Sequence, residues 1–464
     1  MFKYTALCVA LFAPLSTYAA SDEDLRAIRA QIQQLKENYE QRITQLEQRL
    51  QQAEASSKNA ETTAVQAQAA VQQASRPAAS SEGAFNPAMS LILSGTYGQL
   101  QRDPAISTTG FAMSPNNNGY TKGFSLKESE LGVSANIDPQ FRGVATMSLN
   151  PAGGVTVENG FVQTTSLGNG FNFKFGRYFS GLGYLNEQHA HAWDFVDQPL
   201  VYRTLWDNQV GEDGVQLKWL APTDAFVELG AELGSGRSFP GSGRQKNGAG
   251  SGVLFAHVGD DVGTGGSWRA GVSLHQTKAE NWVSNNVPNL AGTVGGVSDR
   301  FSGDSKTAGL DFVWKYAPNG NVTETNFKLQ GEYFRRKQSG LLTYDFTAPG
   351  VTPAGVNITD TYAVTQSGWY MQGVYQFMPR WRMGLRYDQL DPGIAQVGAL
   401  NAVNVISNYG YTPKRDTLML DFNPSEFSRL RVQVAQDKSR QGLTDNQLFL
   451  QYVMSLGAHG AHQF

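Results

Sequence analysis

The sequence predicts an all-β protein, a transmembrane antiparallel β-barrel of about 16 strands preceded by an N-terminal α-helical coiled coil. Three observations lead to this prediction. Charged residues make up only 17% of the 464 residues, whereas aromatic residues make up 11% and glycine occurs 50 times. From residue 88 onward, segments of about ten residues alternate apolar and polar side chains. Short connections also alternate with long ones, as they do in outer-membrane barrels.

The composition excludes several other classes of protein. Lys and Arg number 37 against 40 Asp and Glu, a net charge of -3, so we expect no nucleic-acid partner. Beyond residue 20 no apolar run of ~20 residues occurs, which excludes a helical membrane protein. The single cysteine, Cys8, lies in the leader, so we expect no disulfide and no cysteine zinc site. Because the G-x-S-x-G, Walker A and H-E-x-x-H motifs are absent, we expect no enzymatic activity.

Residues 1–19 have the features of a secretory signal peptide. Lys3 supplies a positive charge, and residues 4–15 form an apolar run that is too short to span a bilayer. Thr17 and Ala19 are the small residues expected before a cleavage site. These features predict export from the cytoplasm.

Residues 20–55 are predicted to form a coiled coil in the periplasm. Apolar residues recur there at steps of three and four, with polar residues between them. The seam consists of Leu25, Ile28, Ile32, Leu35, Tyr39, Ile43, Leu46 and Leu50. A single amphipathic helix on a globular core is the alternative, but the apolar stripe is narrow for that role. A coiled coil requires partner chains and therefore predicts an oligomer. Residues 56–87, rich in Ala, Gln and Ser, are interpreted as a weak helix and linker.

The outer-membrane barrel is predicted over residues 88–464. Phe171, Phe173 and Phe175 share one strand face, while Asn172 and Lys174 share the other. Short connections are expected near residues 138, 167, 221, 317, 378 and 423, and long ones over 101–121, 180–211, 235–250, 281–303, 339–363 and 391–411. Aromatic residues near the short connections favour a membrane barrel over a β-sandwich; they include Trp219, Phe226, Trp314, Tyr316, Phe377, Trp381, Phe422 and Phe427. A C-terminal strand with alternating apolar residues that ends in Phe464 resembles the assembly signal of bacterial outer-membrane proteins.

Residues 157–187, VENGFVQTTSLGNGFNFKFGRYFSGLGYLNE, carry a family resemblance. With the leader, coiled coil and barrel, this segment resembles the trimeric porins of the phosphate-selective porin O/P superfamily, in the group with an N-terminal coiled coil. The resemblance implies a homotrimer and a passive channel whose third extracellular loop folds inward. Phosphate selectivity in that family needs a ladder of inward Arg and Lys, from which this chain departs.

Strand parity places charges of both signs on the pore wall. The basic residues are Lys174, Lys218, Arg269, Lys328, Arg382, Arg386 and Arg431. The acidic residues are Glu128, Glu130, Glu228, Glu232, Asp311, Glu332, Asp388 and Asp421. This mixture argues against phosphate selectivity.

The predicted third extracellular loop, residues 180–211, carries the densest group of polar residues. We expect it to narrow the pore through Glu187, His189, His191, Asp194, Asp197, Arg203 and Asp207, with the acidic and His residues meeting the Arg and Lys of the wall. His189 and His191 are spaced so that both rings lie on one face of an extended chain. With Asp194 they form a candidate site for transient Zn²⁺ binding. The alternative is a solvated loop in which two His happen to be close.

The sequence therefore predicts an outer-membrane porin, a passive channel for small hydrophilic solutes or ions. The expected partners are two further copies of the chain, outer-membrane lipid and the solute, without a resident cofactor. Two alternatives are an outer-membrane receptor or channel for metal, in particular zinc, and a structural tether between the outer membrane and the cell wall. The acidic residues of the third loop predict that cations are tolerated and that phosphate is not favoured.

Overall fold

The chain divides into two units, Met1–Phe85 and Asn86–Phe464. The computed structural model describes residues 87–102, 108–111, 114, 121–127, 129–149, 153–241, 247–284, 299–344, 357–402 and 410–457, and five positions between residues 33 and 44. Those five positions are helical: Gln33, Lys36, Glu37, Glu40 and Thr44. The signal peptide, the apolar seam of the coiled coil, the linker, Glu128 and Phe464 lie outside the described residues.

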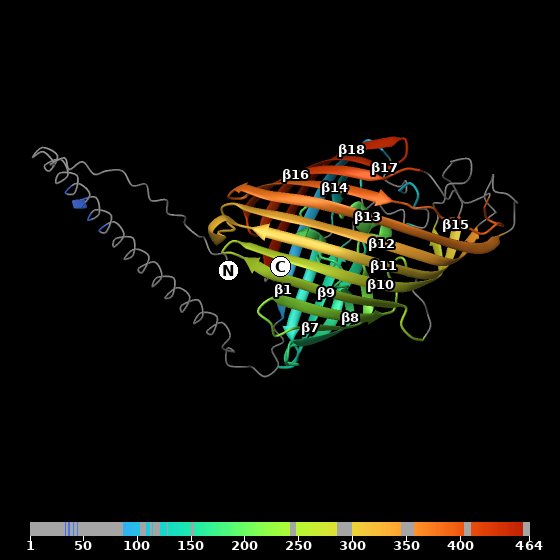
Figure 1. Cartoon of the computed structure of the whole chain (residues 1–464), viewed down its shortest axis with the longest axis horizontal. Helices are drawn as coiled ribbons and strands as arrows, with labels where there is room; N and C mark the ends of the chain where they lie inside the picture. Colours follow the sequence, from blue (N-terminus) through green and yellow to red (C-terminus); the bar gives the residue numbers. More distant parts are fainter. Residues whose placement is uncertain are drawn as a thin grey trace, which may run out of the picture. The chain divides into compact units, whose positions relative to one another are not determined.

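The second unit is a β-barrel in which neighbouring strands are antiparallel (Figure 1). It closes where β1 pairs with β18, from Ser90 opposite Gly457 to Leu100 opposite Gln447. The strands are β1 (Ala88–Leu100), β2 (Gly123–Leu126), β3 (Ser129–Asn136), β4 (Phe141–Leu149), β5 (Val155–Thr164), β6 (Phe171–Phe179), β7 (Gly211–Leu220), β8 (Phe226–Gly234), β9 (Ser251–Val262), β10 (Gly266–Ser284), β11 (Asp299–Tyr316), β12 (Asn326–Tyr344), β13 (Ile358–Met378), β14 (Trp381–Asp391), β15 (Gln396–Val397), β16 (Lys414–Ser425), β17 (Ser428–Arg440) and β18 (Leu443–Gly457).

Within the described residues, the predicted number of spanning strands is confirmed. β2 and β3 both pair with β1, and together they make one spanning strand. β15 is a two-residue strand that pairs with β13, and it is not counted as a spanning strand. Counted in this way, the 18 strands of the sheet give 16 that form the wall. None of the described helices has the length and hydropathy needed to cross a bilayer.

Two of the expected long connections are shorter than the sequence indicates. β10 continues to Ser284 and β11 begins at Asp299, while β12 continues to Tyr344 and β13 begins at Ile358, so the expected limits 281–303 and 339–363 are wrong. The strands continue because their inward residues pack into a separate apolar cluster, in which Phe301 and Tyr362 lie 5.8 Å apart between ring centres. On the same side, β17 and β18 are joined by only Gln441 and Gly442.

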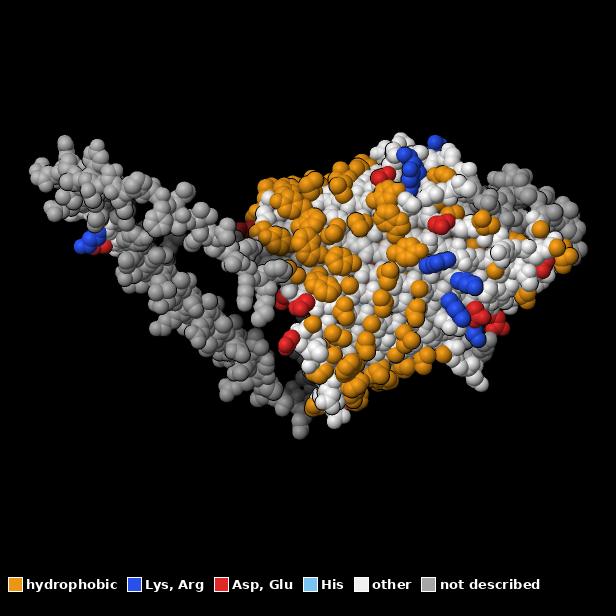
Figure 2. Space-filling view, in the orientation of Figure 1, with side chains coloured by type: hydrophobic (Ala, Val, Ile, Leu, Met, Phe, Trp, Pro, Cys, Tyr) orange, Lys and Arg blue, Asp and Glu red, His pale blue; other side chains and the backbone are white. Residues whose placement is uncertain are grey.

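The outward face of the wall is apolar over the half nearer the short turns (Figure 2). Leu217, Val272, Leu385 and Val432 are 40–61% exposed there, as a lipid-facing surface requires. Near the short turns, Trp381 packs against Phe422 with the rings tilted by 33° and 4.7 Å between their centres. Such aromatic pairs form the girdle of a transmembrane barrel at the membrane interface.

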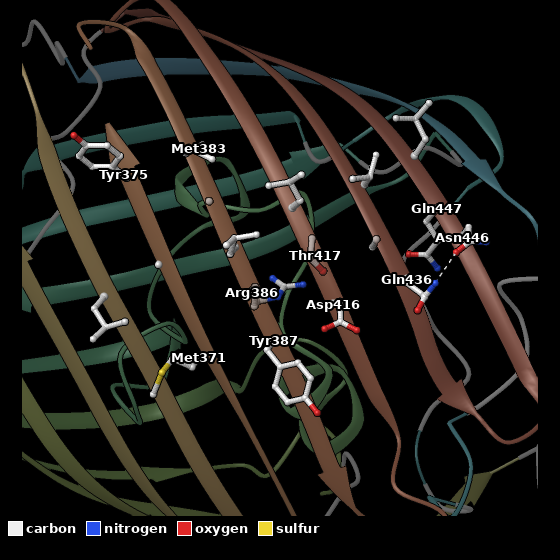
Figure 3. Close-up of a pocket in the computed structure, with 18 of the residues that line it drawn as sticks. Met371, Tyr375, Met383, Arg386, Tyr387, Asp416, Thr417, Gln436, Asn446 and Gln447 are labelled. Atoms are coloured by element: carbon white, nitrogen blue, oxygen red, sulfur yellow. Dashed lines mark hydrogen bonds between the residues drawn. The ribbon is translucent and has the colours of Figure 1, made fainter. Parts of the chain in front are cut away.

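A hollow on this outward face lies between β12 and β18 (Figure 3). Met371, Tyr375 and Met383 line its apolar part, while Gln436 donates a 3.4 Å hydrogen bond to Asn446 at its polar edge. Because these residues have outward parity, this hollow belongs to the membrane-facing surface and not to the pore.

Introducing a charge on the outward face tests the assignment. Leu385→Arg is expected to lower the free energy of unfolding by about 2–4 kcal/mol, because Arg near the bilayer centre loses its hydration. Gln436→Arg, also outward but at the polar edge, is the matched control, with an expected cost of about 0–1 kcal/mol. Urea unfolding of both variants in lipid vesicles measures the difference. Equal costs would contradict the depth assigned to Leu385.

Candidate functional site

Residues 180–210 connect β6 to β7 and are called the third loop below. The loop contains a 3₁₀ turn, η1 (Ala190–Ala192), and a short helix, α2 (Leu200–Trp206), all of whose residues are buried. Trp206 packs edge-on against Phe334 of β12 at 4.7 Å between ring centres. The loop and the wall share an apolar cluster that includes Leu182, Leu185, Trp193, Leu200, Val201, Tyr202, Leu205, Val253, Phe255, Tyr370 and Leu390. Apolar burial therefore fixes the loop against inward-facing residues of the strands.

Glu332 of β12 holds the beginning of the third loop. Its carboxylate accepts hydrogen bonds from the backbone N–H groups of Tyr184 (3.0 Å) and Leu185 (3.2 Å). It also accepts hydrogen bonds from the hydroxyls of Tyr202 (2.7 Å) and Tyr370 (2.6 Å). Gly183, with φ +67°, allows this approach, since a Cβ there would collide with the Glu332 carboxylate. Sequence parity placed Glu332 on the inner wall but gave no sign of this role.

Asp197 holds the middle of the third loop to strands β14, β16 and β17, which follow β12 and β13 in the wall. Its carboxylate pairs with Arg386 of β14 at 3.0 Å and with Arg415 of β16 at 2.5 Å. It also accepts a 3.0 Å hydrogen bond from Gln433 of β17. The Asp197, Arg386 and Arg415 side chains are each 5% exposed or less. These are buried charges that stabilise the fold only while they remain paired.

Asp194 meets a group of four cations that we call the basic cluster: Lys328, Arg382, Arg429 and Arg431. Asp194 pairs with Lys328 and, at 3.4 Å, with Arg382. Asp421 of β16 is shared by Arg382 (2.6 Å), Arg431 (2.7 Å) and Arg429 (3.9 Å). Burial alone would raise the pKa of Asp194, but the charges of Lys328 and Arg382 hold it well below its ordinary value. Four cations therefore face two carboxylates.

Glu187 forms a second ionic contact with the wall. Lys218 of β7 donates to both of its carboxylate oxygens at 3.0 and 3.1 Å, and lies 3.8 Å from Glu228. Burial tends to raise the pKa of Glu187, but Lys218 and Lys174 lower it to about 2. Lys174 also lies over the ring of Phe161, 4.7 Å from its centre. The acidic residues of the loop thus contact basic residues of the wall.

Arg269 of β10 contacts the third loop without an acidic loop partner. It lies over the ring of Tyr184, 4.8 Å from its centre, and donates a 3.2 Å hydrogen bond to the Gly183 carbonyl. Its nearest carboxylate is Asp311 of β11, at 3.6 Å.

The two histidines of the loop have partners that differ from those expected. His189 Nδ1 lies 2.9 Å from Glu158 of β5 and 3.2 Å from Glu130 of β3. His191 Nδ1 lies 3.0 Å from the other oxygen of Glu130. Of the contacts expected between the His residues and wall Arg or Lys, Arg429 donates a 3.2 Å hydrogen bond to the His191 backbone carbonyl, whereas both rings face carboxylates. Asp194 is bound to the basic cluster instead of to the histidines. The loop crosses between an acidic part of the wall and a basic one.

A metal ion could draw on Glu130, Glu158 and His189, whose ligand atoms all lie within 4.8 Å of one another. In this set, the His189 nitrogen that faces the carboxylates is better suited to hold a proton than to bind a metal ion. Burial alone would lower the pKa of His189, but hydrogen bonds to Glu130 and Glu158 raise it to about 10. The nitrogen that faces both carboxylates therefore carries a proton near neutral pH. A metal would have to displace that proton.

Asn159 of β5 completes the surroundings of His189. Its amide nitrogen lies 2.8 Å from His189 Nε2, while its buried oxygen has no partner among the described atoms. With the amide turned by 180°, this oxygen accepts from Nε2–H, and the amide nitrogen takes the position in which the oxygen has no partner. That orientation fits a doubly protonated His189.

The raised pKa of His189 predicts a pH window for loop stability. Since the folded-state pKa is raised from 6.5 to about 10, the stabilisation is fully present below pH 6.5 and is lost as pH rises through about 10. The free energy of unfolding of the native chain, measured between these pH values, should fall as the pH rises. The fall should be smaller in His189→Gln. A variant with an unchanged pH profile would contradict the ionic role of His189.

The remaining predicted loop residues lie around α2. Arg203 is buried on the helix, 4.0 Å from Asp197. Asp207 is the residue after the helix, with φ 53° and ψ 47°. Burial raises the pKa of Asp207 to about 6 in spite of the charge of Arg203.

The sequence did not lead to several cations of the inner wall, among them Arg429, Arg336 and Arg415. Arg429 shares the parity of Arg431 and could have been assigned from it. Arg336, which donates a 2.9 Å hydrogen bond to the Leu205 carbonyl, is obscured by the consecutive cations Arg335, Arg336 and Lys337. Arg415 follows the end of the last long connection, where alternation has barely begun.

No family model matches the chain. Among solved structures, a loop L8 deletion mutant of OmpT, an outer membrane protein of Vibrio cholerae, is 14% identical with a TM-score of 0.49, covering 80% of this chain and 99% of that chain. An anion-selective porin from Comamonas acidovorans is 13% identical with a TM-score of 0.47, with the same coverage. The outer membrane channel DcaP of Acinetobacter baumannii is 13% identical with a TM-score of 0.44, covering 80% and 97%.

The sequence comparison finds a more similar protein. An uncharacterized protein of Aquifex aeolicus (strain VF5) is 30% identical over 416 residues, which cover 83% of this chain and 81% of that protein. This identity extends over most of both chains, and the chain therefore belongs to the same family as the Aquifex aeolicus protein.

Proposed function

We propose that this protein is a passive diffusion channel of the bacterial outer membrane for small hydrophilic solutes, narrowed by its third loop. One observation carries the proposal: the charged side chains of the loop are paired with inward residues of two different parts of the wall. Asp194 and Asp197 contact the Arg- and Lys-rich strands β12, β14 and β16, whereas His189 contacts Glu130 and Glu158 on β3 and β5. A loop held across a barrel in this way leaves a narrow path beside opposed charges.

The basic cluster gives the channel a modest preference for anions. Lys328, Arg382 and Arg429 each keep 19–20% of the side chain exposed, although Asp194 and Asp421 lie among them. Two positive charges remain in excess, which raises the local concentration of anions in a confined space. The preference replaces the tolerance of cations expected from the sequence. Glu187 and Glu228 also face the interior, and their negative charges argue against specificity for phosphate.

The reversal potential across a planar bilayer with a salt gradient tests both the channel and its preference. The native chain is expected to give stepwise openings and a reversal potential of anionic sign. The Arg382→Gln/Arg429→Gln variant should move that potential toward zero or to the cationic sign. Lys414→Gln/Lys438→Gln, which removes two charges with outward parity from β16 and β17, is the control and should leave it unchanged. An absence of conductance would favour the tether, and equal shifts in both variants would contradict the role of the basic cluster.

The zinc alternative has one observation in its favour, the closeness of Glu130, Glu158 and His189. The proton held by His189 makes it the weaker proposal at neutral pH. The homotrimer also remains a proposal, supported by the heptad seam and by the helical positions between residues 33 and 44. A periplasmic location of the helical segment follows from the even number of barrel strands.

A further inference from the structure

Three cations stand on the outward face of β11 and β12 beside the apolar band: Lys306, Arg335 and Lys337. The strand register places them in rows. The first row is apolar, with Val272, Leu310, Tyr333 and Trp369 side by side. The next contains Leu274, Ala308, Arg335 and Ser367, and the third contains Gln276, Lys306, Lys337 and Thr365. Arg335 therefore lies in the row next to the apolar row that contains Tyr333 and Trp369. Lys306 and Lys337 lie in the row after that.

These three side chains are exposed, and none has an ion-pair partner among the described residues. Figure 2 shows Lys and Arg side chains beyond the apolar band over this part of the wall, with acidic side chains near them. Asp304, the acidic residue nearest to Lys306 along β11, is opposite Lys278 in the register. Positive charge is therefore in excess around the three cations.

The placement of two lysines directly opposite each other has a physical cost. Lys306 and Lys337 are register partners, so their Cβ atoms are about 4.5–5.5 Å apart, and like charges at such positions destabilise a sheet. Arg335 lies one row away, about 7 Å along the strand. A single phosphate group can accept hydrogen bonds from all three side chains and remove the repulsion.

We propose that Lys306, Arg335 and Lys337 bind the phosphate groups of a phosphorylated glycolipid in the outer leaflet. Tyr333 and Trp369 place the neighbouring row at the membrane interface, where aromatic residues of barrels gather. The cations are on the long-connection side of that row, at the level of lipid head groups, while Leu310 and Val272 contact the acyl chains. Basic residues at this level attract anionic lipids. The proposal rests on the outer-membrane location proposed above but not on channel activity.

Lipid retention by the full-length protein tests the proposal. The protein is purified in neutral detergent micelles containing either a bisphosphorylated bacterial glycolipid or its dephosphorylated form, and bound lipid is counted by native mass spectrometry. The native chain should retain the phosphorylated form alone. Lys306→Gln/Lys337→Gln should weaken retention by about tenfold or more. The control Arg142→Gln/Arg380→Gln, which removes two exposed charges near the short turns, should behave as the native chain.

Three results would overturn the proposal. They are equal retention by the Lys306→Gln/Lys337→Gln variant and the native chain, equal retention of the dephosphorylated lipid, and displacement of the lipid by millimolar inorganic phosphate, which would make free phosphate the ligand. The Gln substitutions lie on the exposed face, and circular dichroism verifies that the variants are folded. Because lipid retention is measured without current, loss of channel activity and loss of lipid binding are separate outcomes.

Discussion

Replacing Glu332 by alanine is expected to release the third loop and to raise single-channel conductance. The substitution leaves two buried N–H groups and two tyrosine hydroxyls without their acceptor. Hydrogen bonds to a charged group contribute about 1.5–3 kcal/mol each, and they are not additive. We therefore expect the free energy of unfolding to fall by about 3–5 kcal/mol. Planar-bilayer recordings and denaturant unfolding of the same preparation measure the two effects.

Glu332→Gln is the matched control for this prediction. The side chain keeps its shape and one oxygen acceptor, and the hydroxyls of Tyr202 and Tyr370 can rotate to accept from its amide. The backbone N–H groups of Tyr184 and Leu185 cannot reverse their polarity, so one of them loses its partner. The variant should fall between the native chain and Glu332→Ala. If Glu332→Ala had native conductance, Glu332 would not anchor the loop.

The second large effect is expected at Asp197. Asp197→Ala removes the carboxylate that lies between Arg386 and Arg415, whose side chains are 1% and 0% exposed. Removing one partner of a buried ion pair costs about 3–5 kcal/mol, because the remaining charge is left without compensation. Asp388 and Asp437 keep part of the compensation, at 3.0 and 3.7 Å from the two arginines. The measured loss should therefore lie near the lower limit.

A double-mutant cycle identifies the origin of the Asp197 effect. Combining Asp197→Ala with Arg415→Gln should cost less than the sum of the two single variants, since the second change removes the unpaired charge. Asp197→Asn keeps an acceptor for Gln433 and separates the hydrogen bond from the charge. Strict additivity in the cycle would show that Asp197 and Arg415 do not depend on each other.

The sequence by itself determined that the chain forms a barrel and that most of the charged wall residues face its interior. Alternation with a period of two follows from the strand backbone, in which successive side chains point to opposite faces. Parity therefore assigned Lys218, Arg382 and Glu332 to the interior and Leu217 and Leu385 to the outside before any contact was known. The same local rule failed at the strand extensions of β10 to β13. There both faces carry polar residues, and the strands persist because Phe301 and Tyr362 meet inside.

Only the tertiary structure decided which charges meet. His189 pairs with Glu130 and Glu158, and Asp194 pairs with Lys328, over sequence separations that no local pattern specifies. The third loop has no repeating backbone geometry, so its side-chain directions depend on where its apolar residues pack. Trp206 and Tyr202 fix that packing against Phe334. The charged side chains of the loop then pair with the oppositely charged wall residues nearest to them, because a buried charge without a partner is energetically costly.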